Sequence, residues 1–226
     1  MNITFLGHGS LQIRTGEHEL VIDPFISGNP LAKGKVSLDS LNPDYLLLTH
    51  AHQDHILDVE ALAGRTGATI ISNYEIVTHY QAKGFEGHPM NHGGGRTFPF
   101  GWLKYVNAVH TSSFPDGSYG GQPGGFVLKS GGKCLYISGD TALHMDMKLI
   151  PLDGKPDLAV LPIGDNFTMG PEDAARAAGF VDAGRVMGVH YDTFGYIEID
   201  REAALQTFDR AGVTLLLPEI GETLEV

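Results

Sequence analysis

The sequence of 226 residues contains a single cysteine, Cys134, and this scarcity excludes two kinds of protein. An intrachain disulfide needs two cysteines, and a metal cluster held by thiolates needs several. Cys134 lies in the alternating segment GKCLYIS, so we expect it to be a buried strand residue. A protein without disulfides suits a reducing compartment, and a cytoplasmic location is expected.

Long hydrophobic runs are also missing. No segment of 18 apolar residues occurs, and the start of the chain, MNITFLGHG, has no basic group before an apolar stretch. A transmembrane helix needs about 20 apolar residues, and a secretory signal needs a charged start followed by an apolar core. We therefore expect no membrane insertion.

Basic residues are few. The 15 Lys and Arg residues against 27 Asp and Glu give a formal net charge of −12. Sequence-independent binding to nucleic acid needs clustered Lys and Arg, and here these residues are scattered singly. We therefore expect no nucleic-acid partner but a small-molecule substrate. An acidic chain still binds an anion where metal ions supply positive charge.

Linkers, repeats and low-complexity segments are absent as well, so residues 1–226 are expected to form one domain. Strands are expected at 2–7, 11–15, 19–24, 45–50, 68–72, 101–110, 157–164, 185–190 and 213–219. Residues 124–140 are expected to form a hairpin of two strands around Gly131 and Gly132. Helical spacing predicts helices at 56–65, ending at Gly64, and at 73–84, 170–184 and 201–212. Strands that cluster in runs, with helices inserted, favour two mixed sheets packed face to face with helices outside.

Histidine, by contrast, is concentrated in one place. The segment LTHAHQDHILD contains His50, His52, Asp54 and His55 within six positions, directly after the apolar run YLLL. Burying imidazoles and carboxylates is costly unless they are paired. The alternatives are a solvated polar loop and a metal site.

Four other polar residues follow predicted strands in the same way. They are Asp23, His110, Asp140 and His190. Ligand sites gather where strand ends meet at one edge of a layered fold, and rigid elements hold such groups with the precision a metal needs. A mixed imidazole and carboxylate set suits zinc, manganese, iron or nickel. The sequence therefore favours the metal site.

The segment HAHQDH resembles the H-x-H-x-D-H signature of the metallo-β-lactamase superfamily, and the four strand-ending residues appear in the order typical of that family. More narrowly, IDPFISGNP, SGDTALHMDMKLI, LPIGDNFTMGPEDA and VHYDTF resemble a branch of small metal-dependent hydrolases. Relatives of that branch include ascorbate-6-phosphate lactonase and N-acylphosphatidylethanolamine phospholipase D. The resemblance covers residue 3 to about residue 195.

This resemblance implies a four-layer αββα sandwich with a site for two divalent metal ions, zinc foremost and manganese, iron or nickel as alternatives. The implied ligands are His50, His52 and His110 for one metal, Asp54, His55 and His190 for the other, and Asp140 as the bridge. Asp23 is expected behind the ligands, where it would orient an imidazole.

The chemistry of such a site is hydrolysis. Two metals about 3.5–4 Å apart lower the pKa of a shared water to near 7, and the bridging hydroxide attacks the substrate. We therefore expect cleavage of a small polar phosphodiester, ester or lactone. Asp54 and Asp140 are the expected catalytic carboxylates, Asp54 either binding metal or handling protons.

Four residues have two interpretations each. His8, in the turn LGHGS, either lines the substrate cleft or bonds its own backbone, and His92 lies in a glycine-rich loop that could approach substrate. Asp165 and Asn166 precede a helix start, a favourable place for an anion. They either contact substrate or cap and close the turn.

Other functions remain open at this stage. A mononuclear thioester or persulfide enzyme, similar to glyoxalase II or to an oxidoreductase, would use the same fold. The di-iron oxidoreductases of the fold usually carry Glu where His52 stands, together with a flavin domain. A non-catalytic metal-binding protein is the third alternative. Association into a homo-oligomer is compatible with all three.

Overall fold

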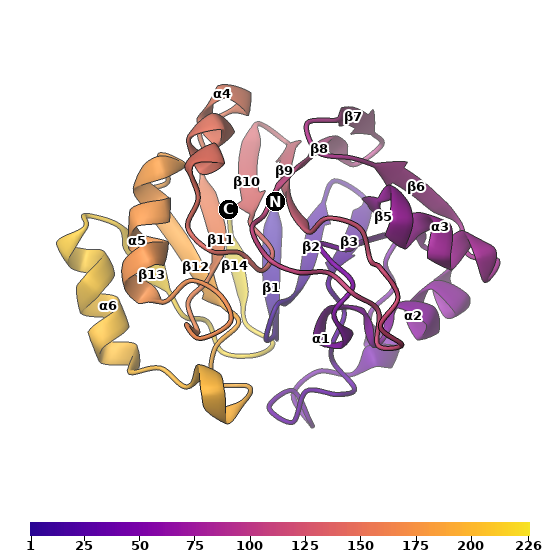
Figure 1. The fold of residues 1–226 in the computed structure, drawn as a ribbon, viewed down its shortest axis with the longest axis horizontal. Coiled ribbons are helices and arrows are strands. Elements are labelled where there is room, and N and C mark those ends of the chain that lie inside the picture. Colours follow the sequence, from indigo (N-terminus) through magenta and orange to yellow (C-terminus); the bar gives the residue numbers. More distant parts are fainter.

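Two seven-stranded β-sheets form the centre of the computed structural model, which describes residues 1–226 (Figure 1). The order of the first sheet is β14 (Thr223–Glu225), β1 (Asn2–Gly7), β2 (Ser10–Thr15), β3 (His18–Ile22), β4 (Tyr45–Leu47), β5 (Thr69–Asn73), β6 (Gly87–Met90). The order of the second is β13 (Thr214–Leu216), β12 (Arg185–Val189), β11 (Leu158–Pro162), β10 (Lys133–Ile137), β9 (Gly124–Ser130), β8 (Gly101–Asn107), β7 (Gly95–Phe98). Both sheets are mixed, which confirms the predicted fold class.

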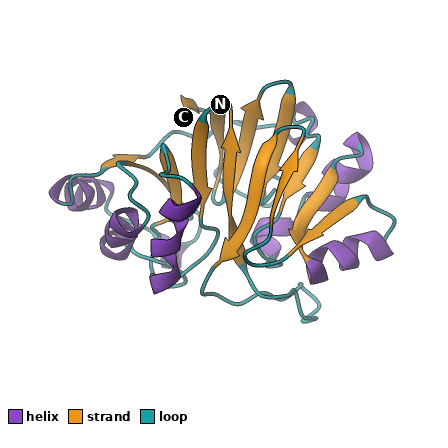
Figure 2. Ribbon diagram, turned by 90° about the horizontal axis from the view of Figure 1, so that it is seen from above, coloured by secondary structure: helices purple, strands orange, loops and turns teal.

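Helices cover the outer faces of both sheets, as Figure 2 shows. The first sheet carries α1 (Gln53–Ile56), α2 (Val59–Thr66) and α3 (Tyr74–Ala82). The second carries α4 (Ile150–Asp153), α5 (Pro171–Phe180) and α6 (Arg201–Arg210). Three 3₁₀ helices complete the set: η1 (Leu38–Ser40), η2 (Met145–Leu149) and η3 (Gly195–Ile197). No helix has the length and apolar character that crossing a membrane requires.

Three buried clusters hold the layers together. The central cluster lies between the sheets and joins side chains such as Ile13 and Leu47 to Tyr105 and Phe126. The two outer clusters lie beneath the helices of each sheet. Burying an aliphatic or aromatic side chain stabilises a fold by about 1.5–3 kcal/mol. The sheets therefore form a rigid base for the loops at their edges.

The strand directions bring the predicted site residues to one edge of the sandwich. In the first sheet β1, β3 and β4 run in the same direction, because β2 is antiparallel to both β1 and β3 and β4 is parallel to β3. In the second sheet β8, β10, β11 and β12 likewise share one direction. The loops that follow these strands therefore lie together at one edge, where α1 also lies (Figure 1).

One predicted helix is divided in the structure. The prediction of a single helix at 56–65 ending at Gly64 is wrong, because α1 ends at Ile56 and α2 begins at Val59. Between them, Asp58 accepts hydrogen bonds from the backbone N–H of Ile26 (2.6 Å) and Ser27 (2.9 Å) and from the Ser27 hydroxyl. These partners come from a distant segment and fix the break. The helix α2 ends at Thr66 rather than near Gly64, and Gly67 caps it with a left-handed backbone (φ of 72°) that suits glycine.

Candidate metal centre

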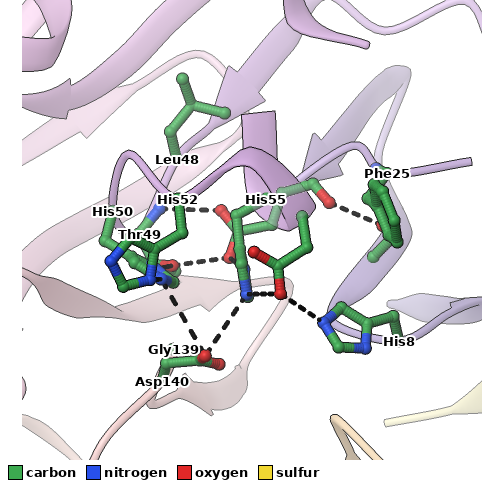
Figure 3. A network of polar contacts seen from close by, with 12 residues as sticks. His8, Phe25, Leu48, Thr49, His50, His52, His55, Gly139 and Asp140 are labelled. Atoms are coloured by element: carbon green, nitrogen blue, oxygen red, sulfur yellow. Dashed lines mark hydrogen bonds and ion pairs between the residues drawn. The ribbon is translucent and has the colours of Figure 1, made fainter. Parts of the chain in front are cut away.

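Nine polar side chains come together at the edge where these strands end. His8 follows β1, Asp23 follows β3, His50 and His52 follow β4, and Asp54 and His55 lie on α1. From the second sheet, His110 follows β8, Asp140 follows β10 and His190 follows β12. Figure 3 shows part of this cluster, with Asp140 from the second sheet facing His50 and His55 from the first. The cluster therefore lies between the ends of the two sheets.

A single carboxylate oxygen lies at the centre of the cluster. The distances from Asp140 Oδ2 to the Nε2 atoms of His190, His55, His110 and His50 are 3.0, 3.4, 3.7 and 3.9 Å. The Asp140 side chain is only 6% exposed. A buried carboxylate surrounded by imidazole nitrogens from both sheets can share a cation with them.

The imidazoles on either side of Asp140 fall into two groups. The ligand atoms of His50, His52 and His110 all lie within 4.8 Å of one another, and His50 Nε2 is 3.0 Å from His52 Nδ1. Neutral imidazoles are metal ligands, and burial lowers the pKa of His50 well below its ordinary value and also lowers the pKa of His52 and His110. The three rings are thus ready to bind a cation.

The second group contains His8, Asp54, His55 and His190, whose ligand atoms also lie within 4.8 Å of one another. Asp54 has 29% of its side chain exposed and forms the open side of this group. The Nε2 atom of His55 is buried and has no hydrogen-bond partner. Buried polar atoms are nearly always paired, so this orphaned nitrogen supports a cation at this point. The donor set therefore fits a divalent metal.

Asp23 lies behind the second group and fixes His55. Its carboxylate accepts hydrogen bonds from the backbone N–H of Thr49 (2.8 Å), the Thr49 hydroxyl (2.6 Å) and His55 Nδ1 (2.9 Å). Because Nδ1 donates to Asp23, the Nε2 atom of His55 is left to face Asp54 and Asp140. A carboxylate behind a ligating histidine fixes the orientation of the ring.

Carboxylates and imidazoles shift one another's pKa values strongly. Burial lowers the pKa of His190, but the Asp140 carboxylate outweighs this effect and raises it to about 9. The pKa of His55 is raised well above its ordinary value by Asp140 and Asp23 against the same opposing burial. In the other direction, burial and His190 lower the pKa of His8 to about 4. Such divergent shifts are typical of functional sites.

Backbone strain accompanies the same residues. His8, Asp23 and His190 adopt left-handed conformations with φ of 56°, 44° and 55°. Each such residue costs about 1–3 kcal/mol and persists only where its surroundings fix it. The strain supports a functional role for these three strand ends.

His92 lies apart from the cluster. Its Nε2 donates to the Pro123 carbonyl at 2.9 Å and its ring packs beside Tyr105 at 4.9 Å. It lines a separate cavity of about 280 Å³, together with Lys104 and His144. His92 therefore holds the loop between β8 and β9 in place and does not belong to the cluster.

Asp165 and Asn166 also lie outside the cluster. Both adopt left-handed conformations, with φ of 59° and 53°. The Asp165 backbone N–H donates to the Met169 carbonyl (3.1 Å), and Asp165 Oδ1 accepts from the Asn166 N–H (2.8 Å). These bonds close the turn before α5. Asp165 also lines an open cavity of about 580 Å³ between the starts of α5 and α6.

Three further residues lie beside the cluster: Thr111, which no sequence pattern indicates, and Thr193 and Phe194, which follow His190 in the segment VHYDTF and could line the same pocket. Thr111 Oγ1 lies 3.3 Å from His52 Nε2, and Thr193 Oγ1 lies 3.0 Å from His8 Nδ1. The ring of Phe194 packs 5.3 Å from that of His8 and is 37% exposed. Thr111 directly follows the strand-ending His110, and this position is the one signal that could have indicated it.

Comparison with known proteins gives the same family for nearly the whole chain. The model of the Beta-lactamase superfamily domain matches residues 2–190. A UPF0173 metal-dependent hydrolase from Christiangramia forsetii is 61% identical over 226 residues, covering all of both chains, and one from Flavobacterium johnsoniae is 56% identical with the same coverage. Among solved structures, the metallo hydrolase Igni18 from Ignicoccus hospitalis has a TM-score of 0.89 and 33% identity, covering 99% of this chain and 97% of its own.

The fold, the cluster of histidines and carboxylates at the strand ends, and these full-length similarities agree. The chain belongs to the β-lactamase superfamily and, within it, to the UPF0173 metal-dependent hydrolases.

Proposed function

We propose that this hydrolase holds two divalent metal ions, with zinc as the first candidate and manganese, iron or nickel as alternatives, and cleaves a small polar phosphodiester, ester or lactone. The observation that carries the proposal is the position of Asp140 Oδ2, within 3.0–3.9 Å of four imidazole Nε2 atoms. One oxygen shared by ligands of two groups is what a pair of metals requires.

The assignment of ligands follows the two groups. His50, His52 and His110 would hold one cation, Asp54, His55 and His190 the other, and Asp140 both. The donors offer two sets without a common member, His50, His52 and His110 in one and Asp54, His55 and His190 in the other, and this supports two metals over the mononuclear alternative. A third set, Asp23, His50 and His55, joins the two. The open side at Asp54 supports a catalytic site over a purely metal-storing one, because a substrate can reach it.

Bound cations would supply Lewis-acid chemistry, polarising a substrate oxygen and lowering the pKa of water from about 15.7 to near 7. The chain supplies the rest. Asp54, ionised and partly exposed, can accept a proton at Oδ1 or Oδ2 and release it toward the leaving group. Asp23 keeps the His55 ring fixed, so that its Nε2 stays directed into the cleft.

Activity measurements test the reaction class. Purified protein, stripped with chelator and then reloaded with zinc or with manganese, is assayed against chromogenic phosphodiesters, carboxylic esters, lactones and thioesters. We expect hydrolysis only by the reloaded protein, and only of phosphodiesters, carboxylic esters or lactones. Turnover of thioesters alone would favour the mononuclear alternative, and activity that survives metal removal would contradict the proposal.

The metal-free protein should lose stability as pH rises. Its His190 has a pKa of about 9, above the ordinary 6.5 that it regains on unfolding. The ion pair with Asp140 therefore stabilises the fold fully below about pH 6.5, and this contribution is lost as pH rises through about 9. His55 shifts in the same direction. We expect the Tm of chelator-treated protein to fall between about pH 6.5 and 8.5 for this reason.

Metal should reverse this trend. Binding needs deprotonated ligands, so the rise in Tm on adding buffered free zinc should grow over the same interval. Differential scanning fluorimetry with and without zinc gives both curves. A Tm of the metal-free protein that increases with pH, or a zinc effect that shrinks, would contradict the assigned pairs.

A further inference from the structure

His8 lies between two side chains from distant parts of the chain. Its Nδ1 atom is 3.0 Å from the Thr193 hydroxyl oxygen, and its Nε2 atom is 3.0 Å from Asp54 Oδ2. Figure 3 shows the His8 ring beside the His55 side of the cluster. The residue is only 2% exposed. Substrate therefore reaches Asp54 before it reaches His8, and the buried ring acts through its neighbours.

The backbone holds His8 in this place. The His190 N–H donates to the His8 carbonyl at 3.0 Å, and the two rings lie 4.1 Å apart. The backbone of both residues adopts the left-handed conformation. The position of the His8 ring is thus coupled to the strand end that supplies His190.

The hydrogens in this chain of contacts can be assigned. An ionised carboxylate only accepts hydrogen bonds, so the contact with Asp54 needs a hydrogen on His8 Nε2. A neutral imidazole then has a lone pair on Nδ1, which accepts the hydrogen of the Thr193 hydroxyl. The other acceptor within reach of that hydroxyl, the Tyr191 carbonyl, is farther away at 3.3 Å. Burial of the ring beside His190 and His55 disfavours a doubly protonated His8.

We propose that Thr193 and His8 form a positioning chain for Asp54: the Thr193 hydroxyl fixes the His8 tautomer with its hydrogen on Nε2, and that N–H holds the Asp54 carboxylate beside His55 and His190. A protonated Nε2 cannot bind metal. His8 therefore stays outside the ligand set, although its nitrogen lies within 4.8 Å of the ligand atoms of this group. The inference rests on the proposed metal site of Asp54, His55 and His190.

The other neutral tautomer of His8, with its hydrogen on Nδ1, would give His8 a different role. If Nδ1 carried the hydrogen and donated to Thr193, the lone pair of Nε2 would face the Asp54 carboxylate at 3.0 Å. Two acceptors at that distance repel each other unless a cation lies between them. His8 would then be a fourth ligand of the second metal, and its Nε2 signal would respond directly to metal.

Nitrogen NMR of the histidine rings distinguishes the two tautomers in metal-free protein. His8→Asn, which tolerates the left-handed backbone, identifies the His8 signals by their loss. We expect a neutral ring with hydrogen on Nε2, before and after zinc is added. A hydrogen on Nδ1, or a His8 Nε2 that becomes a zinc ligand, would overturn the proposal. This measurement is independent of the proposed activity.

Zinc affinity tests the positioning role. In a His110→Ala background, which leaves the second group intact, Thr193→Val removes the hydroxyl at nearly constant volume and Thr193→Ser restores it. We expect Thr193→Val to weaken zinc binding by about 10–100-fold, as loss of a hydrogen bond behind a ligand typically does, and Thr193→Ser to stay near the parent. Equal zinc affinity of the His110→Ala parent and both Thr193 variants, measured by titration calorimetry, would refute the positioning role of Thr193 and His8. Absence of zinc binding in the parent would instead refute the proposed function.

Discussion

Asp140→Asn is expected to reduce hydrolysis by about 100- to 1000-fold, the range seen when one electrostatic contact to the reacting group is lost. Asp140 Oδ2 lies within 3.0–3.9 Å of four imidazole Nε2 atoms, so its negative charge would serve both proposed metals at once. The amide has the same shape but no charge. The substitution therefore leaves the packing intact and removes the bridge. The measurement is kcat/KM with the best substrate of the panel, at saturating zinc.

Asp182→Asn is the matched control. Asp182 also has a left-handed backbone, but its carboxylate is paired at the surface with Lys155 at 3.1 Å and belongs to none of the histidine and carboxylate groups of the candidate site. We expect kcat/KM of this variant to equal that of the parent protein. Parent-like activity in Asp140→Asn, with circular dichroism showing a native fold, would remove Asp140 from the proposed mechanism.

Removing the metals is expected to lower Tm by about 8–16 °C for each of the two proposed sites, relative to protein with free zinc at 1,000 times its Kd. One site at that concentration contributes about 4.1 kcal/mol, and in a chain of this size each kcal/mol shifts Tm by about 2–4 °C. Without cations, the cluster must keep His55 Nε2 unpaired. Differential scanning fluorimetry of chelator-treated and zinc-loaded protein at pH 7 measures the difference.

Two variants show whether the shift comes from this site. His18→Asn replaces a histidine outside the cluster, beside Asp44 on the surface, and should keep the full difference in Tm. His190→Ala should lose much of it. A chelator effect that is the same in His190→Ala as in the parent would mean that metal stabilises the fold from elsewhere.

The sandwich could be predicted because its strands are short, strongly apolar and bounded by glycine. The segments YLLL and LAVLP carry this signal by themselves. The edge strands β6 and β14 do not: Gly87–Met90 is partly exposed, and Thr223–Glu225 depends on pairing with β1. The division of α1 from α2 was equally hidden, because Asp58 accepts from Ile26 and Ser27, about 30 residues earlier.

The metal cluster could be anticipated because its residues either stand close together, as from His50 to His55, or directly follow apolar strands. The contacts that support it could not. Thr193 and His8 are 185 positions apart, and the segment VHYDTF that contains Thr193 does not indicate which side chain its hydroxyl contacts. Asp165 and His92 are polar residues in glycine-containing loops, a pattern that predicts a turn as readily as a binding residue.

Metal stoichiometry in three proteins tests the central claim most directly. Elemental analysis is applied to the parent protein, His110→Ala and His190→Ala, each saturated with zinc and then desalted. The proposed assignment predicts two zinc ions per chain in the parent and one in each variant, because each substitution removes a ligand of a different metal. No zinc in the parent, or the same number in all three, would contradict it.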